Sequence, residues 1–425
     1  MTNLTRRGFV KLAGGLAAVG VAAPRLAHAA AKSQVVVIGG GYGGAIAAKY
    51  IRMMDANIDV TLIEASLNYV SCPLSNPILI EKRDLAVQTW DVNSLQKHGI
   101  KVVIDMATDI DPVKKKVTTK SGKEYIYDRL VVSPGVDFKW GAIPGYDEAA
   151  AELMPHAWKA GPQTTKLRDK LKAMPDGEPF IIVAPPNPYR CPPGPYERAS
   201  LVAYYLKQHK PKSKVIILDP KDKFSKQGLF TGGWQENGLN IEWVPGANGG
   251  KVASVDAKAG VVKTEMEEYK SSCVNVIPPM MAGEIAKKAG LTNESGFCPV
   301  DFTTFESTLH KDIHVIGDSC IAGAMPKSGY AANSQGKVVA AAIVALLNGK
   351  PVGEPSYVNT CYSLITPDYG ISVAGIYKMD KVEGKDTIKE VKGGVSPAKA
   401  SPAFRKQEAL YAESWYQSIM ADMFL

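Results

Sequence analysis

The chain has 425 residues, of which 45% are hydrophobic and 22% charged; this excludes a disordered or fibrous protein and predicts two or three globular domains. The formal net charge is +8, but four of the basic residues lie within positions 1–30, which contain no acid, so only +4 remains on the rest. A charge this small and this evenly spread does not indicate a nucleic-acid-binding protein.

The N-terminal segment, residues 1–30, has the pattern of a signal peptide. Arg6 and Arg7 precede an apolar stretch at 12–23 that is too short to span a bilayer, and small residues around Ala29 offer a cleavage site. This arrangement predicts a twin-arginine signal and export of the folded protein to the periplasm. No later apolar run approaches membrane length, so we expect no integral membrane segment in the mature chain.

A dinucleotide-binding motif follows the signal peptide. Residues 35–38 form an apolar run typical of a buried parallel strand, and residues 45–53 are predicted to form a helix. Between them lie the three glycines of a GxGxxG pattern: Gly39, Gly41 and Gly44. The first permits a tight turn, the second lets the backbone approach a pyrophosphate, and the third allows close packing of helix on strand.

The second strand of this unit is predicted at residues 59–63 and ends in an acid. Glu64 lies where a carboxylate can accept hydrogen bonds from both ribose hydroxyls, and Ala65 follows it at the same strand end. A glycine motif alone is a weak signal. Strand, glycines, helix, second strand and terminal acid in this order predict a dinucleotide site.

Two later segments favour FAD over NAD at this site. Residues 127–135 form a predicted strand that ends in a turn of small residues, and residues 313–318 form another that ends in an acid. Both resemble the remaining fingerprints of flavoproteins with two dinucleotide-binding domains. The resemblance implies four further cofactor-binding residues: Ser133, Gly135, Gly317 and Asp318. A helix cap for the aspartate and a plain turn for the glycine are the simpler alternatives.

A second nucleotide-binding unit is visible, but its phosphate loop is abnormal. The unit consists of predicted strands at 179–184 and 214–219 with a helix at 197–207. The intervening loop, residues 185–195, contains six prolines, which have no N–H to donate to a pyrophosphate. We therefore expect this domain to have lost an NAD(P)H site.

The six cysteines are widely spaced. No pair has the spacing of zinc or iron–sulfur ligands, so no metal site is predicted, and without a CxxCH motif any haem must belong to another polypeptide. Six cysteines allow 15 disulfide pairings, and a structural disulfide is the simplest interpretation of any one of them. The six are Cys72, Cys191, Cys273, Cys298, Cys320 and Cys361.

Three longer motifs make the resemblance specific. They are CPPGPYERAS from Cys191, MPKSGYAANSQGKV from Met325 and NTCYS around Cys361. Over essentially its whole length the chain resembles the flavoprotein subunit of flavocytochrome c sulfide dehydrogenase. The resemblance implies that Cys72 carries FAD through an 8α-S-cysteinyl bond, although Pro73 follows it here. It also implies that Cys191 and Cys361 form a redox-active disulfide beside the flavin.

The resemblance further implies a function. The protein would be an FAD-dependent sulfide dehydrogenase in which HS⁻ attacks the disulfide and electrons pass through the flavin to a c-type cytochrome subunit, with haem c only on that partner of a heterodimer. The helix starting near Ser328, with Gly329 and Tyr330, would point its N-terminus at the flavin. Sulfide:quinone oxidoreductase and an accessory flavoprotein of a sulfur-oxidising multienzyme system are the alternatives.

The expected architecture is an α/β fold with two Rossmann-like domains. We predict an FAD-binding domain from residues 31–143 and 271–338, a second domain at 144–270, and a C-terminal domain at 339–425 that covers the flavin. The remaining cysteines, at positions 273, 298 and 320, are expected to be buried free thiols. The aromatic tail at 411–424 either packs as a terminal helix or faces a partner.

Overall fold

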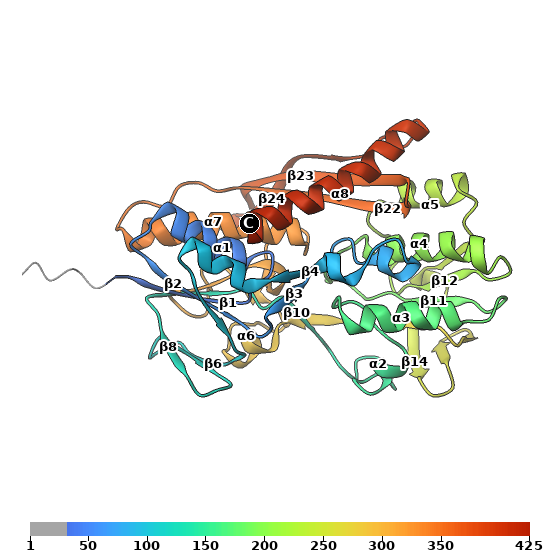
Figure 1. Cartoon of the computed structure of the whole chain (residues 1–425), viewed down its shortest axis with the longest axis horizontal. Coiled ribbons are helices and arrows are strands. Elements are labelled where there is room, and N and C mark those ends of the chain that lie inside the picture. The colour runs from blue at the N-terminus through green and yellow to red at the C-terminus, as the bar shows by residue number, and fades with distance from the viewer. Residues whose placement is uncertain (1–31) are drawn as a thin grey trace, which may run out of the picture. The chain divides into compact units, whose positions relative to one another are not determined.

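The computed structural model describes residues 32–425, so the predicted signal peptide lies outside the described residues. The dinucleotide motif belongs to a five-stranded parallel sheet with strand order β20-β9-β1-β2-β5. Figure 1 labels β1 and β2 of this sheet. The expected strands at 35–38 and 59–63 are confirmed, each one residue longer. The strands of this sheet are β1 (Gln34–Ile38), β2 (Asp59–Glu64), β5 (Lys101–Ile104), β9 (Arg129–Val132) and β20 (Ile313–Val315).

Helix α1 (Gly44–Met54) packs on this sheet and α7 (Gly329–Leu347) packs on α1. A Cβ at Gly336 of α7 would lie 2.6 Å from the Gly43 carbonyl oxygen, so only glycine permits this approach. Among the described residues, α7 is the one helix long and apolar enough to cross a membrane, which corrects the expectation that no later stretch reaches that length. More than half of it is buried, as in the core helix of a globular protein.

A second parallel sheet holds the abnormal loop. Its strand order is β13-β12-β11-β17, and β17 (Val274–Val276) lies just beyond the predicted domain boundary at 270. The loop after β11 leads directly into α4 (Gly194–His209), which starts three residues before the predicted helix. The other elements are β11 (Phe180–Val183), β12 (Val215–Leu218), β13 (Ile241–Val244), α3 (Pro162–Ala173) and α5 (Gln227–Glu236).

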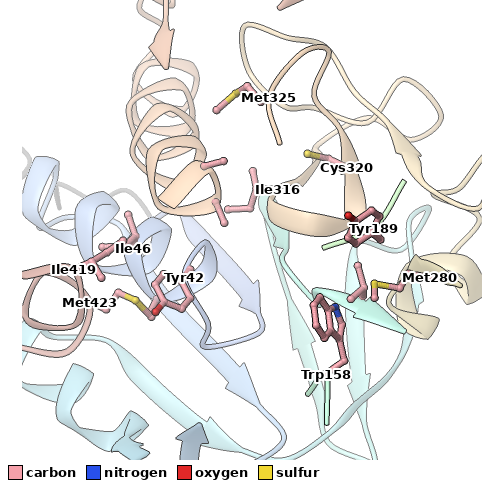
Figure 2. Close-up of a cluster of buried hydrophobic side chains, with 14 of the residues drawn as sticks. Tyr42, Ile46, Trp158, Tyr189, Met280, Ile316, Cys320, Met325, Ile419 and Met423 are labelled. Atoms are coloured by element: carbon pink, nitrogen blue, oxygen red, sulfur yellow. The ribbon is translucent and has the colours of Figure 1, made fainter. Parts of the chain in front are cut away.

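The C-terminal part is an antiparallel sheet with a long helix on it. β22 (Ser356–Thr366), β23 (Tyr369–Val382) and β24 (Lys385–Val395) form the sheet, and α8 (Pro402–Phe424) packs on β23, so the tail is a helix. Figure 2 shows Ile419 and Met423 of α8 beside Tyr42 and Ile46, at the start of the dinucleotide unit. The end of the chain therefore packs on its first helix, and all three sheets share one core.

Short elements connect these three sheets. Two further antiparallel three-stranded sheets, β6-β7-β8 and β14-β15-β16, are inserted. β10 pairs with β18 between the two parallel sheets. The two parallel sheets with their helices confirm the predicted α/β fold with two Rossmann-like units. The remaining elements are β3 (Asn68–Val70), β4 (Thr89–Asp91), β6 (Ala107–Asp111), β7 (Lys116–Thr119), β8 (Glu124–Ile126), β10 (Val136–Phe138), α2 (Ala150–Leu153), β14 (Val252–Asp256), β15 (Val261–Thr264), β16 (Glu268–Lys270), β18 (Met280–Ala282), α6 (Glu284–Lys288), β19 (Cys298–Pro299), β21 (Cys320–Ile321) and the 3₁₀ helices η1 (Asn76–Ile80), η2 (Leu85–Gln88), η3 (Val92–His98), η4 (Gly246–Asn248) and η5 (Gly317–Ser319).

Candidate active site

The turn from β1 into α1 brings the three motif glycines to the positions that their predicted roles require. Gly39 has φ +96°, and a Cβ there would meet the Ser133 carbonyl oxygen at 2.3 Å. A Cβ at Gly44 would lie 1.8 Å from the Gly39 carbonyl oxygen, so this glycine serves the packing of helix on strand. Gly41 lines a cavity at the carboxyl ends of the strands, named here the glycine cavity.

The acid at the end of β2 lies at the edge of this cavity. The Glu64 carboxylate accepts a hydrogen bond from the Gly40 N–H at 2.6 Å, which holds it against the glycine turn. It lines the glycine cavity, whereas Ala65 is exposed and is not among the lining residues. The structure therefore brings the carboxylate to the other predicted residues and leaves Ala65 outside.

The later strand ends reach the same cavity. Ser133 and Gly135 after β9, and Gly317 and Asp318 after β20, all line it. The Asp318 Oδ1 atom is buried without a hydrogen-bond partner, and burial raises the pKa of this carboxyl group, although Arg190 and Lys327 oppose the shift. A buried acceptor without a donor beside a glycine turn fits FAD, because the flavin nucleotide carries hydroxyl groups along its ribityl chain.

A second cavity collects the three cysteines singled out by the resemblance. Cys72, Cys191 and Cys361 all line this space, named here the cysteine cavity, and they come from three distant parts of the chain. Cys72 and Arg190 line both cavities, so the two spaces adjoin. All six cysteines are free thiols in the structure, so the predicted Cys191–Cys361 bond is not formed here.

Cys191 is held in an unusual backbone conformation. Its φ is +59°, in the left-handed region that residues with a Cβ adopt rarely, at a cost on the order of 1 kcal/mol. Its N–H donates to the Lys327 carbonyl at 2.8 Å, and its own carbonyl accepts from the Gly194 N–H at the start of α4. Such a conformation persists only where the surrounding structure imposes it, and non-glycine residues that adopt it are found most often at functional sites.

Cys72 lies where the two cavities meet. Its Sγ accepts a hydrogen bond from the Ala160 N–H at 3.4 Å and lies 3.7 Å from the Trp158 carbonyl oxygen. The Arg190 guanidinium donates to that same carbonyl. These contacts orient the thiol, and its position on both cavities suits a thiol that bonds to a cofactor.

Charged groups surround the other two thiols. Burial raises the pKa of Cys191 well above its ordinary value, with Cys361 and Glu197 adding to the effect and Arg190 and Lys226 opposing it. Burial also raises the pKa of Cys361, where Lys226 lowers it and Glu197 raises it. The Glu197 carboxylate accepts from Asn76 Nδ2 at 2.8 Å and from the Leu364 N–H at 2.9 Å.

The N-terminus of α7 also faces the cysteine cavity. Ser328 caps the helix by accepting from the Ala331 N–H, and Ser328, Gly329 and Tyr330 all line the cavity. Tyr330 stacks on Trp415 of α8 at 6.2 Å between ring centroids, and Tyr362 of β22 lies 6.4 Å from the same indole. The predicted helix start is confirmed, and it carries an aromatic cluster that the sequence did not reveal.

The second Rossmann-like unit has its nucleotide site filled. Asp219, the acid at the end of β12, is fully buried and accepts from Tyr196 Oη at 2.5 Å, Trp243 Nε1 at 3.1 Å and Lys221 Nζ at 2.6 Å. Phe224 stacks on Tyr196 with ring centroids 3.7 Å apart. The Lys221 N–H donates a fourth hydrogen bond to Asp219 at 3.0 Å, so this carboxylate has no acceptor capacity left for a ribose, which supports the expected loss of an NAD(P)H site.

Sequence reasoning missed several residues of the cysteine cavity. Glu197 and Arg198 were within the quoted motif CPPGPYERAS, but nothing in the motif separates a buried acid or base from a solvated one. Trp158, which lines the cavity, and Lys226, which donates to Ser363 on β22, carried no signal, because their sequence neighbourhoods show neither a motif nor periodicity. The remaining cysteines, 273, 298 and 320, are buried and free, as expected.

Comparison with known proteins identifies the family. Residues 164–278 match the central part of the sulfide dehydrogenase (flavocytochrome c) flavoprotein chain, residues 353–424 match the flavin-binding part of flavocytochrome c sulphide dehydrogenase, and residues 33–182 match pyridine nucleotide-disulphide oxidoreductases. The chain is 53% identical, over 45 residues, to the sulfide dehydrogenase (flavocytochrome c) flavoprotein chain of Chlorobaculum thiosulfatiphilum; the match covers 11% of this chain and 94% of that relative. The chain belongs to this family of flavoprotein chains.

More distant relatives of this flavoprotein cover more of its length. The mitochondrial sulfide:quinone oxidoreductase of Dictyostelium discoideum is 24% identical over 302 residues, which is 68% of this chain but only 65% of that relative's length. The solved structure of the sulfide:quinone oxidoreductase of Aquifex aeolicus superposes with a TM-score of 0.69 at 21% identity, covering 92% of this chain and 91% of that one. At this identity the superposition shows a shared fold.

Proposed function

We propose that this flavoprotein oxidises sulfide. The observation that carries the proposal is the meeting of Cys72, Cys191 and Cys361 in one cavity that adjoins the glycine cavity. Gly39, Gly41, Glu64 and Asp318 would hold FAD, and Cys72 would bond to it. FAD, when bound, accepts electrons in pairs and releases them singly.

The reacting group is a disulfide between Cys191, in the loop before α4, and Cys361, on β22, which line one cavity. HS⁻ attacks one sulfur of this bond, a new sulfur–sulfur bond forms, and the Cys191–Cys361 bond breaks. The products are a persulfide on one cysteine and a thiolate on the other, so the negative charge that entered with HS⁻ stays in the cavity. Burial raises the pKa of both thiols, so an anion in this cavity requires compensation from nearby positive groups.

We further propose that electrons leave to a c-type cytochrome subunit in the periplasm after export through the twin-arginine signal. Tyr330, Trp415 and Tyr362 support this, because the three rings extend from the cysteine cavity to partly exposed positions on α8 and β22. The names of the relatives point to two acceptors, cytochrome and quinone. The partial exposure of these three residues is the reason to place a docked protein acceptor there.

The acceptor is tested by anaerobic turnover with sulfide and either a c-type cytochrome or a short-chain ubiquinone. We expect reduction of the cytochrome without detergent, and co-purification of a haem-containing subunit when the protein is isolated from its native cells. Detergent-dependent reduction of quinone alone would identify a sulfide:quinone oxidoreductase instead. A flavin reduced by neither route would indicate an accessory flavoprotein.

Nicotinamide nucleotides are expected not to reduce the flavin. The loop at 185–195 lacks donors for a pyrophosphate, and Asp219 is bonded to three side chains. Stopped-flow mixing with NADH or NADPH should leave the flavin absorbance unchanged on the timescale of sulfide reduction. Bleaching by NADH as fast as by sulfide would contradict the assignment of a filled nucleotide site.

A further inference from the structure

Lys226 is a buried lysine that lies against β22, the strand that carries Cys361. It lies immediately before α5, has a φ of +59°, and is only 9% exposed. Its Nζ donates to Ser363 Oγ at 2.8 Å and lies 3.5 Å from the Cys361 carbonyl oxygen. Both acceptors belong to β22, so the amine is directed at the strand that carries Cys361.

This lysine has no carboxylate partner. Within residues 32–425 no ion pair joins it to an acid, whereas Lys221, also largely buried, pairs with Asp219 at 2.6 Å. Burial of an ammonium group without a counter-ion is costly, and proteins normally pair such a charge. The conformation at Lys226 adds a backbone penalty, so the surrounding structure holds this amine in place against two unfavourable contributions.

The groups around Lys226 are those that become anions. Burial lowers the pKa of its ammonium, while Cys361, Glu197, Cys191 and Glu408 raise it. Glu197 of α4 is engaged by Asn76 and by the Leu364 N–H, and it is the acid that raises the pKa of Cys361. Lys226 is the group that lowers the pKa of Cys361, so the two charges act on that sulfur in opposite directions.

We propose that Lys226 is a positioning residue whose ammonium group is the counter-ion for negative charge on the sulfur of Cys361. The proposal rests on the sulfide-oxidising function above. It adds which residue balances the negative charge that forms when HS⁻ opens the disulfide. HS⁻ brings one negative charge, and exchange with the disulfide leaves one neutral persulfide and one thiolate. The charge of Lys226 balances that anion, and no further oxidant or reductant is needed for the step.

The test measures the reactivity of the Cys361 thiol rather than turnover. Holoprotein reduced with a phosphine under argon is treated with iodoacetamide over a series of pH values, and the peptide containing Cys361 is quantified by mass spectrometry. We expect Lys226→Gln to slow alkylation of Cys361 about tenfold near neutral pH, since a shift of one pKa unit changes the thiolate fraction by that factor. Lys226→Arg, which keeps the charge, should restore much of the rate.

Lys221→Gln is the matched control, because it removes a largely buried lysine whose amine bonds to Asp219 and the Pro185 carbonyl and not to β22, the strand of Cys361. It should leave alkylation of Cys361 within about twofold of wild type. An unchanged rate in Lys226→Gln, or an equal loss in Lys221→Gln, overturns the proposal. A thermal unfolding midpoint and a flavin absorption spectrum unchanged from wild type show that the fold of each variant is intact.

The proposed sulfide oxidation and the proposed role of Lys226 can be refuted independently of each other. Alkylation requires no sulfide, so a wild-type protein whose flavin is not reduced by sulfide would refute the proposed function while the alkylation rates still decide the role of Lys226. If sulfide does reduce the flavin, Lys226→Gln should slow that reduction in parallel with alkylation. Normal sulfide-driven reduction in a variant with slowed alkylation would overturn the assigned role in the reaction.

Discussion

Replacing Cys191 by Ser is expected to lower the rate of sulfide-driven flavin reduction by at least about a hundredfold, because removal of a covalent reacting group costs an enzyme several orders of magnitude. A serine cannot form the disulfide that HS⁻ attacks. The cysteine cavity would keep its shape, since the Cys191 N–H and carbonyl make the main hydrogen bonds of this residue. Stopped-flow absorbance of the flavin after anaerobic mixing with sulfide measures the effect.

Two further variants make this result specific. Cys361→Ser should have the same effect as Cys191→Ser, and the double variant should be no worse than either, because both remove one bond. Cys273→Ser is the control: this buried thiol lines neither cavity, so its rate should match wild type. A Cys191→Ser protein that is reduced by sulfide at the wild-type rate would refute the disulfide mechanism.

Replacing Cys72 by Ser should change the flavin from fully retained to fully released on denaturation. In the wild-type protein a thioether would keep FAD on the polypeptide through acid precipitation. The variant should still bind FAD when folded, because Gly39, Gly41, Glu64 and Asp318, which line the glycine cavity, would provide the rest of the site. Flavin fluorescence of the acid supernatant and the mass of the intact chain measure both outcomes.

The control for this change is again Cys273→Ser, which should retain its flavin as wild type does. Quantitative release of FAD from denatured wild-type protein would show that the bond does not exist. Retention of flavin on the Cys72→Ser polypeptide would instead assign the bond to another residue. In that case Cys191 and Cys361, which share the cavity with Cys72, are the next thiols to replace.

Local sequence pattern determined the first Rossmann-like unit almost completely. A buried parallel strand must be apolar along its length, and the turn after it requires glycine at Gly39 for its positive φ and at Gly44 for contact with the Gly39 carbonyl. These requirements act between residues close together in the chain, so they can be predicted from the sequence. The same holds for α7, whose start at Ser328 is set by a capping side chain.

Ala65 shows where this reasoning ends. Its neighbour Glu64 turns toward the glycine turn, because the Gly40 N–H is a donor within reach, whereas Ala65 has no such partner and faces solvent. The end of a strand indicates which residues are near a ligand. It does not say which of two adjacent side chains faces that ligand.

The sequence by itself determined the two parallel sheets, the FAD-type fingerprints and the loss of donors from the proline-rich loop. Only the tertiary structure decided that Cys72, Cys191 and Cys361 line one cavity, that Asp219 is already bonded, and that Lys226 is buried beside Cys361 without an acid. The physical reason is the range of the interactions. Strand, turn and cap preferences act between near neighbours, whereas these partners meet only when three separate sheets pack on a shared core.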